Sequence, residues 1–207
     1  MPDRKHPSSA NNAPANNAPS HTASRKPDSL LVETLKTLAL SFVLALGTRT
    51  YIAEARFVPT GSMQPTIEID DHLLIDKVSY RFGAPQRGDI IVFAPPLALE
   101  QQNMRDALVK RVIGLPGEQI EIKNGQVFVD GQALSENYTK EAADYTLQPT
   151  QIPPDQYLVL GDNRNNSNDS HVWGFVPREK IIGRVLVRYW PLNRVGPIEP
   201  LPSYHEP

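Results

Sequence analysis

The sequence contains no cysteine among its 207 residues. This absence excludes disulfide bonds, thiolate zinc sites and cysteine nucleophiles. Aromatic residues make up only 7% of the chain, and the formal net charge is −2. A chain with so little excess charge gives no indication of a nucleic-acid partner.

Large apolar side chains are missing from Ser8–Ser20, within an N-terminal stretch of mostly Asn, Pro, Ala and Ser. Such a segment cannot offset the entropy of ordering, so we predict a disordered tail over residues 1–28. The 20 prolines, clustered at the two ends and in loops, argue against an all-helical body. Four of them lie in residues 192–207, which we predict to be a Pro-rich C-terminal tail.

A long apolar segment, TLKTLALSFVLALGTRTYIA, occupies residues 34–53. About 20 helical residues span the hydrocarbon core of a bilayer, and the charged Lys36 and Arg49 lie near the ends, where long side chains can reach the headgroups. We therefore predict a transmembrane anchor helix over residues 29–55. A buried amphipathic helix and a cleaved signal peptide are alternatives, since Ala53-Glu54-Ala55 resembles a cleavage site.

Short strand-like segments separated by turn residues dominate residues 56–191. Asn124-Gly125 is a two-residue hairpin signal, and Asp130-Gly131 turns the chain again. No long amphipathic helical pattern appears, so we predict a mostly β domain, with a coiled antiparallel or barrel-like sheet. The predicted strands are His72–Val78, Asp89–Phe93, Ala107–Ile113, Gln119–Lys123, Gln126–Val129, Tyr157–Leu160 and Ile181–Trp190.

One serine lies in a turn whose backbone is tightly specified. Ser62 belongs to PTGSMQPT, residues 59–66, in which Gly61 and the flanking prolines restrict the chain. Such a turn can expose a hydroxyl and aim a backbone N–H at the same point. Taken alone, however, a turn containing a serine is most often only a turn. A serine nucleophile also needs a base.

Lys110 lies within the apolar strand pattern of Ala107–Ile113. Strand alternation sends Lys110 and Arg111 to opposite faces, so one of these two cations is expected to point inward. Desolvation there would lower the pKa of a lysine and leave an amine that accepts a proton. The alternative is a lysine that reaches solvent at a strand edge.

A loop of short polar side chains, GDNRNNSNDS, occupies residues 161–170. Side chains of this kind bond to one another and to nearby backbone, which predicts an ordered loop. An exposed turn or a calcium loop would be the alternatives. Calcium is disfavoured, because Asn163, Asn165 and Asp169 do not follow the spacing of acidic ligands that it requires.

Four segments together resemble a known family. PTGSMQPT, RGDIIVF, KRVIGLPGE and GDNRNNSNDS, in this order behind a membrane segment, resemble the four sequence boxes of type I signal peptidases. The resemblance runs from about Glu54 to Tyr189. It implies a Ser/Lys serine endopeptidase with Ser62 as nucleophile and Lys110 as general base. It implies no metal and no cofactor.

The resemblance also assigns supporting roles. Thr60 matches a hydroxyl that helps to bind the oxyanion, together with the backbone N–H of Ser62. Ser167 matches the residue that orients the lysine amine. Asp169 matches a bracing carboxylate, which we expect to pair with Arg164 or with a neighbouring backbone group. Two positions depart from the family pattern: His171 replaces an arginine and Glu118 replaces an aspartate.

A peptidase of this family implies an exported preprotein as substrate, with small residues in an Ala-X-Ala pattern before the scissile bond. The substrate would lie extended against a β edge. Val58, Pro59, Met63, Ile67 and Val109 match substrate-binding positions. The basic residues before the anchor favour a cytoplasmic N-terminus. The catalytic domain would then lie on the outer face of a cell membrane, or on the lumenal face of a thylakoid membrane, near the translocon.

Three other functions are alternatives to a signal peptidase. A Ser/His/Asp hydrolase would need His72 or His171, but the sequence has no G-x-S-x-G elbow. A self-cleaving repressor would need an N-terminal DNA-binding domain, which residues 1–28 cannot form. A membrane-tethered β module that binds peptides without cutting them is the alternative outside the enzyme class.

Overall fold

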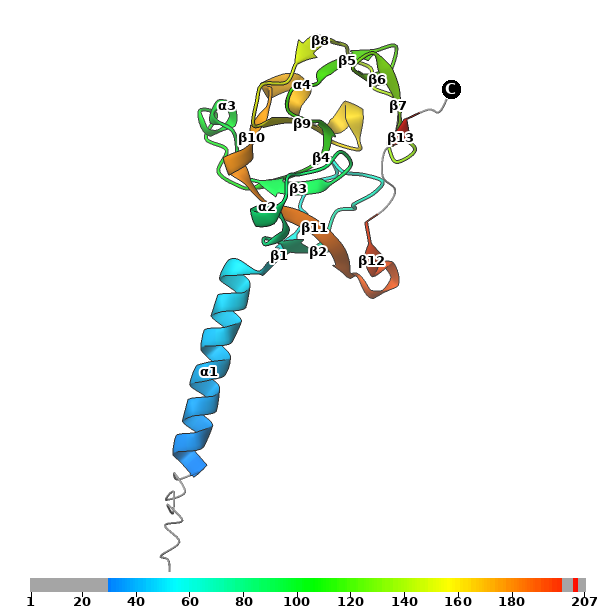
Figure 1. Ribbon diagram of the computed structural model, residues 1–207. Helices are drawn as coiled ribbons and strands as arrows, with labels where there is room; N and C mark the ends of the chain where they lie inside the picture. Colours follow the sequence, from blue (N-terminus) through cyan, green and yellow to red (C-terminus); the bar gives the residue numbers. More distant parts are fainter. Residues whose placement is uncertain (1–29, 199–202, 205–207) are drawn as a thin grey trace, which may run out of the picture. The chain divides into compact units, whose positions relative to one another are not determined.

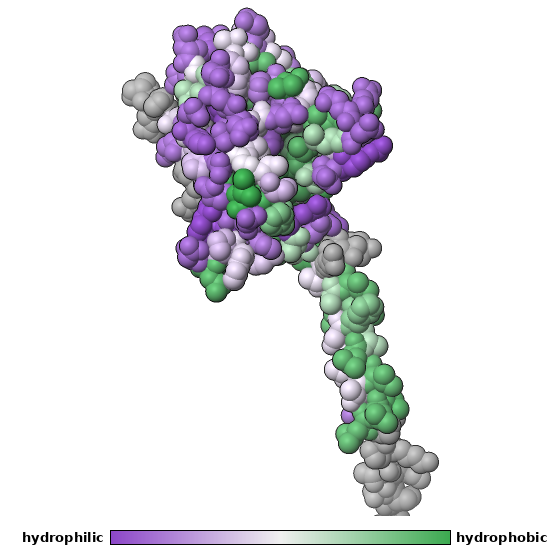
Figure 2. Space-filling model, turned by 180° about the vertical axis from the view of Figure 1, so that it is seen from behind, coloured by the Kyte–Doolittle hydropathy of each residue, from purple (hydrophilic) through white to green (hydrophobic). Residues whose placement is uncertain are grey.

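The computed structural model describes residues 30–198 and 203–204. The tail predicted over residues 1–28 lies outside them. Helix α1 spans Leu30–Tyr51, about 33 Å at the usual rise per residue. Leu, Phe and Val side chains along it are exposed, and the helix surface in Figure 2 is largely hydrophobic. Over Leu30–Thr48 the helix is long and apolar enough to cross a membrane, by length and composition.

The anchor helix ends earlier than the sequence analysis placed it. Residues Ala53–Ala55, assigned to the anchor, belong instead to strand β1, Ala53–Phe57. The reason is backbone pairing, since Ala53 lies opposite Asp76 and Phe57 opposite His72 on the next strand. Only Ile52 separates the end of the helix at Tyr51 from the start of strand β1 at Ala53.

An eight-stranded sheet forms the larger part of the β domain, and it is strongly curled (Figure 1). Its order is β1-β2-β11-β3-β4-β9-β10, with β12 beside β11, and every pairing is antiparallel. The further strands are β2 His72–Asp76, β3 Ile90–Phe93, β4 Leu108–Gly114, β9 Gln156–Leu160, β10 Val176–Pro177, β11 Ile181–Trp190 and β12 Gly196–Pro197. The predicted mostly β, coiled antiparallel fold is confirmed.

A second sheet of five strands has the order β13-β7-β6-β5-β8. Two hairpins turn at Asn124-Gly125 and Asp130-Gly131, where all four residues have positive φ, as two-residue hairpin turns require. The strands are β5 Gln119–Lys123, β6 Gln126–Val129, β7 Gln132–Ser135, β8 Leu147–Gln151 and β13 Ser203–Tyr204. The residues predicted as a C-terminal tail thus contribute β12 to one sheet and β13 to the other.

Short helices punctuate the connections between strands. They are α2 Ser79–Phe82, α3 Leu97–Glu100, α4 Ser170–Trp173, and the 3₁₀ turns Arg164–Asn166, Arg178–Lys180 and Leu192–Arg194. The interior contains three apolar clusters. Strand β4 contributes to all three, through Ile113, Val109 and Val112. Strand β4 therefore packs against apolar side chains on both of its faces.

Candidate active site

The segment between β1 and β2 is anchored by apolar side chains on either side of Ser62. Met63 and Ile67 are 1% and 0% exposed, in the cluster that contains Val92. The Ile67 N–H donates to the Met63 carbonyl over 2.9 Å. From the opposite side, the Asn163 N–H donates to the Ser62 carbonyl over 3.1 Å. Ser62 is thus fixed in place by core packing on one side and by the polar loop on the other.

Lys110 lies on β4 directly beside this serine. Its Nζ donates a 2.7 Å hydrogen bond to Ser62 Oγ and a 3.1 Å bond to the Val109 carbonyl. The side chain is almost completely buried, with 3% of the residue exposed. The structure therefore brings together two residues that stand 48 positions apart in the chain.

Burial lowers the pKa of Lys110 from an ordinary value of 10.5 to about 8, against the opposing pull of the Asp169 and Asp162 carboxylates. At pH 7 such an amine is neutral in about one molecule in ten, compared with about one in 3,000 for an exposed lysine. The hydrogen bond to Ser62 Oγ can then run in either direction, because a neutral amine accepts a proton. The arrangement can accordingly activate a hydroxyl.

One of the two adjacent cations was expected to point inward, and the structure buries both. Arg111 is 0% exposed, and it donates to both Asp162 oxygens, over 2.9 Å from Nε and 2.7 Å from Nη2. Its guanidinium also lies 4.0 Å from the centre of the Tyr138 ring. Strand alternation does separate the two cations, but surrounding residues cover both faces of the curled sheet here, so that Lys110 and Arg111 are only 3% and 0% exposed.

The polar loop approaches the serine most closely at Gly161. A Cβ at this position would lie 2.4 Å from the Ser62 carbonyl oxygen and 2.2 Å from Ser167 Oγ. Real Cβ atoms do not come this close to other atoms, so only glycine allows the approach. Ser167 Oγ is buried and makes no hydrogen bond with any described residue. The bond expected between Ser167 and the Lys110 amine is not formed, because the hydroxyl packs against Gly161 instead.

Asp169 is completely buried, and both of its carboxylate oxygens are bonded. The Gly161 N–H donates to one oxygen over 2.9 Å, and the other lies 2.7 Å from His171 Nδ1. The expected backbone partner is therefore present, whereas Arg164 pairs with Glu136 at 2.6 Å. Sequence reasoning could not find Glu136, since 28 residues separate the two and no pattern links them.

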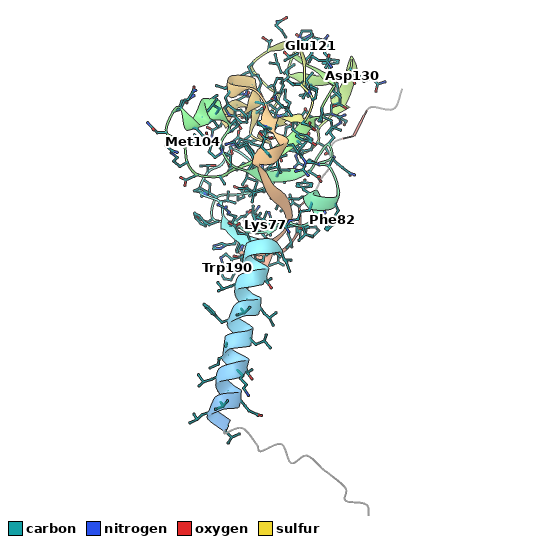
Figure 3. The ribbon with its side chains drawn as sticks, turned by 60° about the vertical axis from the view of Figure 1, so that its left-hand side comes forward. Lys77, Phe82, Met104, Glu121, Asp130 and Trp190 are labelled. Atoms are coloured by element: carbon teal, nitrogen blue, oxygen red, sulfur yellow. The ribbon has the colours of Figure 1, made fainter. Side chains whose placement is uncertain are left out.

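A cleft of about 400 Å³ opens beside Ser62 and Lys110. Thr60, Val58, Pro59, Met63 and Val109, all proposed from sequence, line it. Ile67, also proposed, does not line the cleft, because it is fully buried in the core. Met104 (labelled in Figure 3) and Ala107, between α3 and β4, also line the cleft and were not among the site residues predicted from sequence.

Two unpaired strand edges form the walls of this cleft. Among the described residues, β1 pairs on one side only, with β2. The Leu108–Lys110 part of β4 pairs with β3, and β9 begins to pair with β4 only from Arg111. Residues 56–60 and 106–110 from these two segments line the cleft. An extended peptide could therefore bond to backbone groups here.

A family model described as signal peptidase, peptidase S26, matches residues 31–190. The chain belongs to the type I signal peptidase family. Signal peptidase I of Leptolyngbya laminosa is 56% identical over 181 residues, which make up 86% of this chain and 89% of that protein. This confirms the resemblance found in the four sequence boxes, and it makes the chain a member of a serine peptidase family.

Other members of the signal peptidase family differ more from this chain. Probable thylakoidal processing peptidase 2 of Arabidopsis thaliana is 37% identical over 168 residues, 80% of this chain and 46% of that protein. A crystal structure of a signal peptidase I from Enterococcus faecalis is 34% identical, covers 49% of this chain and 97% of that chain, and has a TM-score of 0.40.

The two departures from the signal peptidase pattern both have partners in the structure. Glu118 accepts from Arg87 over 2.5 and 2.9 Å and from the Leu115 N–H over 2.7 Å. The Glu118 side chain thus links the turn after β4 to Arg87, in the segment before β3. His171, in place of arginine, stays beside Asp169. No group of three or more His, Asp or Glu side chains that could hold a metal occurs within residues 30–198 or 203–204.

Proposed function

We propose that this protein is a membrane-bound serine endopeptidase that removes N-terminal signal peptides from exported preproteins by a Ser62/Lys110 dyad. The observation that carries the proposal is the 2.7 Å contact between Lys110 Nζ and Ser62 Oγ, made by a lysine with only 3% exposure. A base and a nucleophile in hydrogen-bond contact are what covalent hydrolysis by serine requires. Membership of the signal peptidase family supplies the class of substrate.

The reaction begins when Ser62 Oγ attacks the scissile carbonyl and its proton passes to the neutral Lys110 amine. The Ser62 N–H and the Thr60 hydroxyl, which lines the cleft, are the proposed donors to the oxyanion. The Lys110 ammonium then gives its proton to the leaving amine, so that the acyl-enzyme keeps a neutral base. Lys110 next takes a proton from the water that attacks the ester, and it returns this proton to Ser62 Oγ as the bond between the acyl carbon and Oγ breaks.

The substrate would lie extended between β1 and β4 and add its backbone to their unpaired edges. Val58, Met63 and Val109 line the cleft beside Ser62, and they would form shallow apolar pockets. Pockets of this kind admit alanine and exclude larger side chains, which accounts for an Ala-X-Ala preference. Pro59 would restrict the backbone next to the oxyanion site.

The family and the apolar helix α1 together indicate a membrane-anchored protein. We propose that the N-terminus is cytoplasmic and that the β domain lies on the outer or lumenal side, near the translocon. The membrane would be the cell membrane or a thylakoid membrane. An anchor confines the active site to the surface where signal peptides emerge, and it raises their effective concentration.

Cleavage of a purified preprotein by wild type, Ser62→Ala and Lys110→Met tests the proposal. Both variants should lose at least about 10³-fold in kcat/KM, because removal of either member of a nucleophile–base unit disables the whole unit. Lys123→Met, which removes an exposed cation on β5, is the matched control and should keep full activity. An active Ser62→Ala or Lys110→Met enzyme would refute the dyad. Binding without cleavage by wild type would instead favour a peptide-binding module.

A further inference from the structure

His171 lies at the start of helix α4, two residues after Asp169. Its Nδ1 is 2.7 Å from Asp169 Oδ1, and its backbone N–H donates to the same oxygen over 3.2 Å. On its face, the imidazole stacks on the Tyr145 ring, with centroids 3.8 Å apart and planes 12° from parallel. The ring is thus held by a hydrogen bond at its edge and by a flat aromatic contact on its face.

A short series of contacts links this imidazole to the dyad. The second Asp169 oxygen accepts from the Gly161 N–H, and Gly161 lies directly against the Ser62 carbonyl. Two residues on, Asn163 donates from its backbone to Ser62 and from its side chain to the Gly61 carbonyl. Displacement of Asp169 would therefore displace the backbone that fixes the nucleophile.

Asp169 also acts on Lys110 through its charge. Its carboxylate is one of two that oppose the lowering of the Lys110 pKa by burial. A positive charge placed on the far side of Asp169 offsets part of this effect, because opposite charges in contact cancel at a distance. The side chain in that position is His171. Arginine would be charged at every pH, whereas histidine is the side chain whose charge changes between about pH 5 and 8.

We propose that His171 is a positioning residue for the dyad, and that gain of a proton on its imidazole offsets Asp169 and favours the neutral form of the Lys110 amine. The inference rests on the proposed Ser62/Lys110 mechanism. When the imidazole carries a positive charge, Lys110 gives up its proton more easily. Activity then falls with decreasing pH more gradually than a single lysine base would allow.

Several other titratable and charged groups surround this cluster. Tyr145 faces His171 from the segment before β8, and burial together with the Asp169 carboxylate raises its pKa. Arg164, Glu136 and Asp144 lie within electrostatic range of Tyr145, and Arg164 and Glu136 neutralise each other as an ion pair. Asp162 acts on Lys110 but is paired with Arg111. None of these groups lies between His171 and Asp169, which are in direct contact.

The test is the dependence of kcat/KM on pH from about 5 to 9.5 for wild type, His171→Gln and His171→Arg, with the full-length chain and a preprotein substrate. His171→Gln keeps a polar side chain without charge, and its log kcat/KM should fall with slope 1 below the lysine inflection. His171→Arg should show the same slope with the inflection moved to lower pH, and therefore about threefold more activity than His171→Gln at pH 6. Wild type should match the glutamine variant at the alkaline end of this range and move towards the arginine variant at its acidic end.

Val172→Ala, on the exposed side of the same helix, is the control and should follow wild type. Thermal midpoints identify a variant that fails to fold. If that variant is His171→Arg, the contrast between wild type and His171→Gln decides alone. A single shared inflection and slope for all variants, with Lys110→Met inactive, would overturn the role of His171 and leave the dyad intact. An active Lys110→Met would instead overturn the dyad itself.

Discussion

The burial of the Lys110 side chain has two opposing effects, one on its basicity and one on the stability of the fold. In the proposed dyad its burial would make it a base at neutral pH, and the same burial makes its protonated form costly to fold. Both effects follow from the pKa of about 8 and can be measured independently of each other.

The first consequence concerns the rate. In the proposed mechanism the neutral amine is the active form, so kcat/KM should rise with pH and level off above the Lys110 pKa of about 8. From pH 6 to pH 7 the increase should be close to tenfold once the His171 contribution is removed by substitution with glutamine. A profile that is flat from pH 6 to 9, measured with saturating and with limiting preprotein, would contradict a lysine base.

The second consequence concerns stability. The folded pKa of Lys110 lies below its unfolded value, so the buried ammonium destabilises the fold at every pH below about 8. Lys110→Met should therefore be more stable than wild type at pH 7, with a free energy of unfolding larger by about 3 kcal/mol. Its urea midpoint should lie at a correspondingly higher concentration. The difference should shrink as pH rises from 8 towards 10.5 and the wild-type lysine loses its proton in both states. A variant less stable than wild type at pH 7 would show that the charged lysine is well solvated.

Among the structural elements, the loop around Gly161 depends most on exact fit. Gly161→Ala would drive a methyl group into the Ser62 carbonyl and Ser167 Oγ. The loop must then move, and kcat should fall by about 100-fold or more, since misplacement of reacting groups by about 1 Å costs that much. Gly183→Ala is the matched control, because its methyl group would meet the Asp76 carbonyl oxygen at 2.2 Å, on β2.

Both glycine variants should lose stability, but only Gly161→Ala should lose activity per folded molecule. Denaturant unfolding and preprotein cleavage on the same samples separate the two effects. Equal kcat in the two variants would show that the approach of Gly161 serves the fold alone.

Strands rich in β-branched residues could be predicted from sequence almost to the residue. Gln119–Lys123 and Gln126–Val129 have the predicted bounds, because a strict hairpin signal fixes the turn between them. Strands β7 and β8 were missed, since β7 has no β-branched or aromatic residue and β8 contains Pro149. Their pairing is decided by neighbouring strands rather than by their own sequence.

The site could be predicted only in part. The order of the four boxes pointed to Ser62 and Lys110, although no local pattern could give the contact between them. The burial of Arg111 and the unbonded hydroxyl of Ser167 depend on how closely the loops pack, which residue types do not reveal. The cleft residue Met104 lies in a loop without periodicity, so sequence carried no signal for it.

At the scale of the whole molecule, the β domain has its own apolar clusters, and none of the described side chains of helix α1, residues 30–48, belongs to them. A chain that begins at Ile52 should therefore fold and cleave a short soluble peptide with kcat/KM within about threefold of the full chain. It should lose sedimentation with membrane vesicles and cleave membrane-inserted preproteins far more slowly. A truncated chain that fails to unfold cooperatively would show that the helix supports the domain.

The unpaired edges of β1 and β4 offer donors and acceptors that any polypeptide can meet, whatever its side chains. Only the few positions that enter pockets need to be specified by the client. Under the proposed mode of binding, one peptidase could serve a large and changing set of substrates, and a newly exported protein would become a substrate by acquiring two small residues at the right spacing. A broad substrate range of this kind would rest on backbone hydrogen bonds, which place few constraints on the side chains of the substrates.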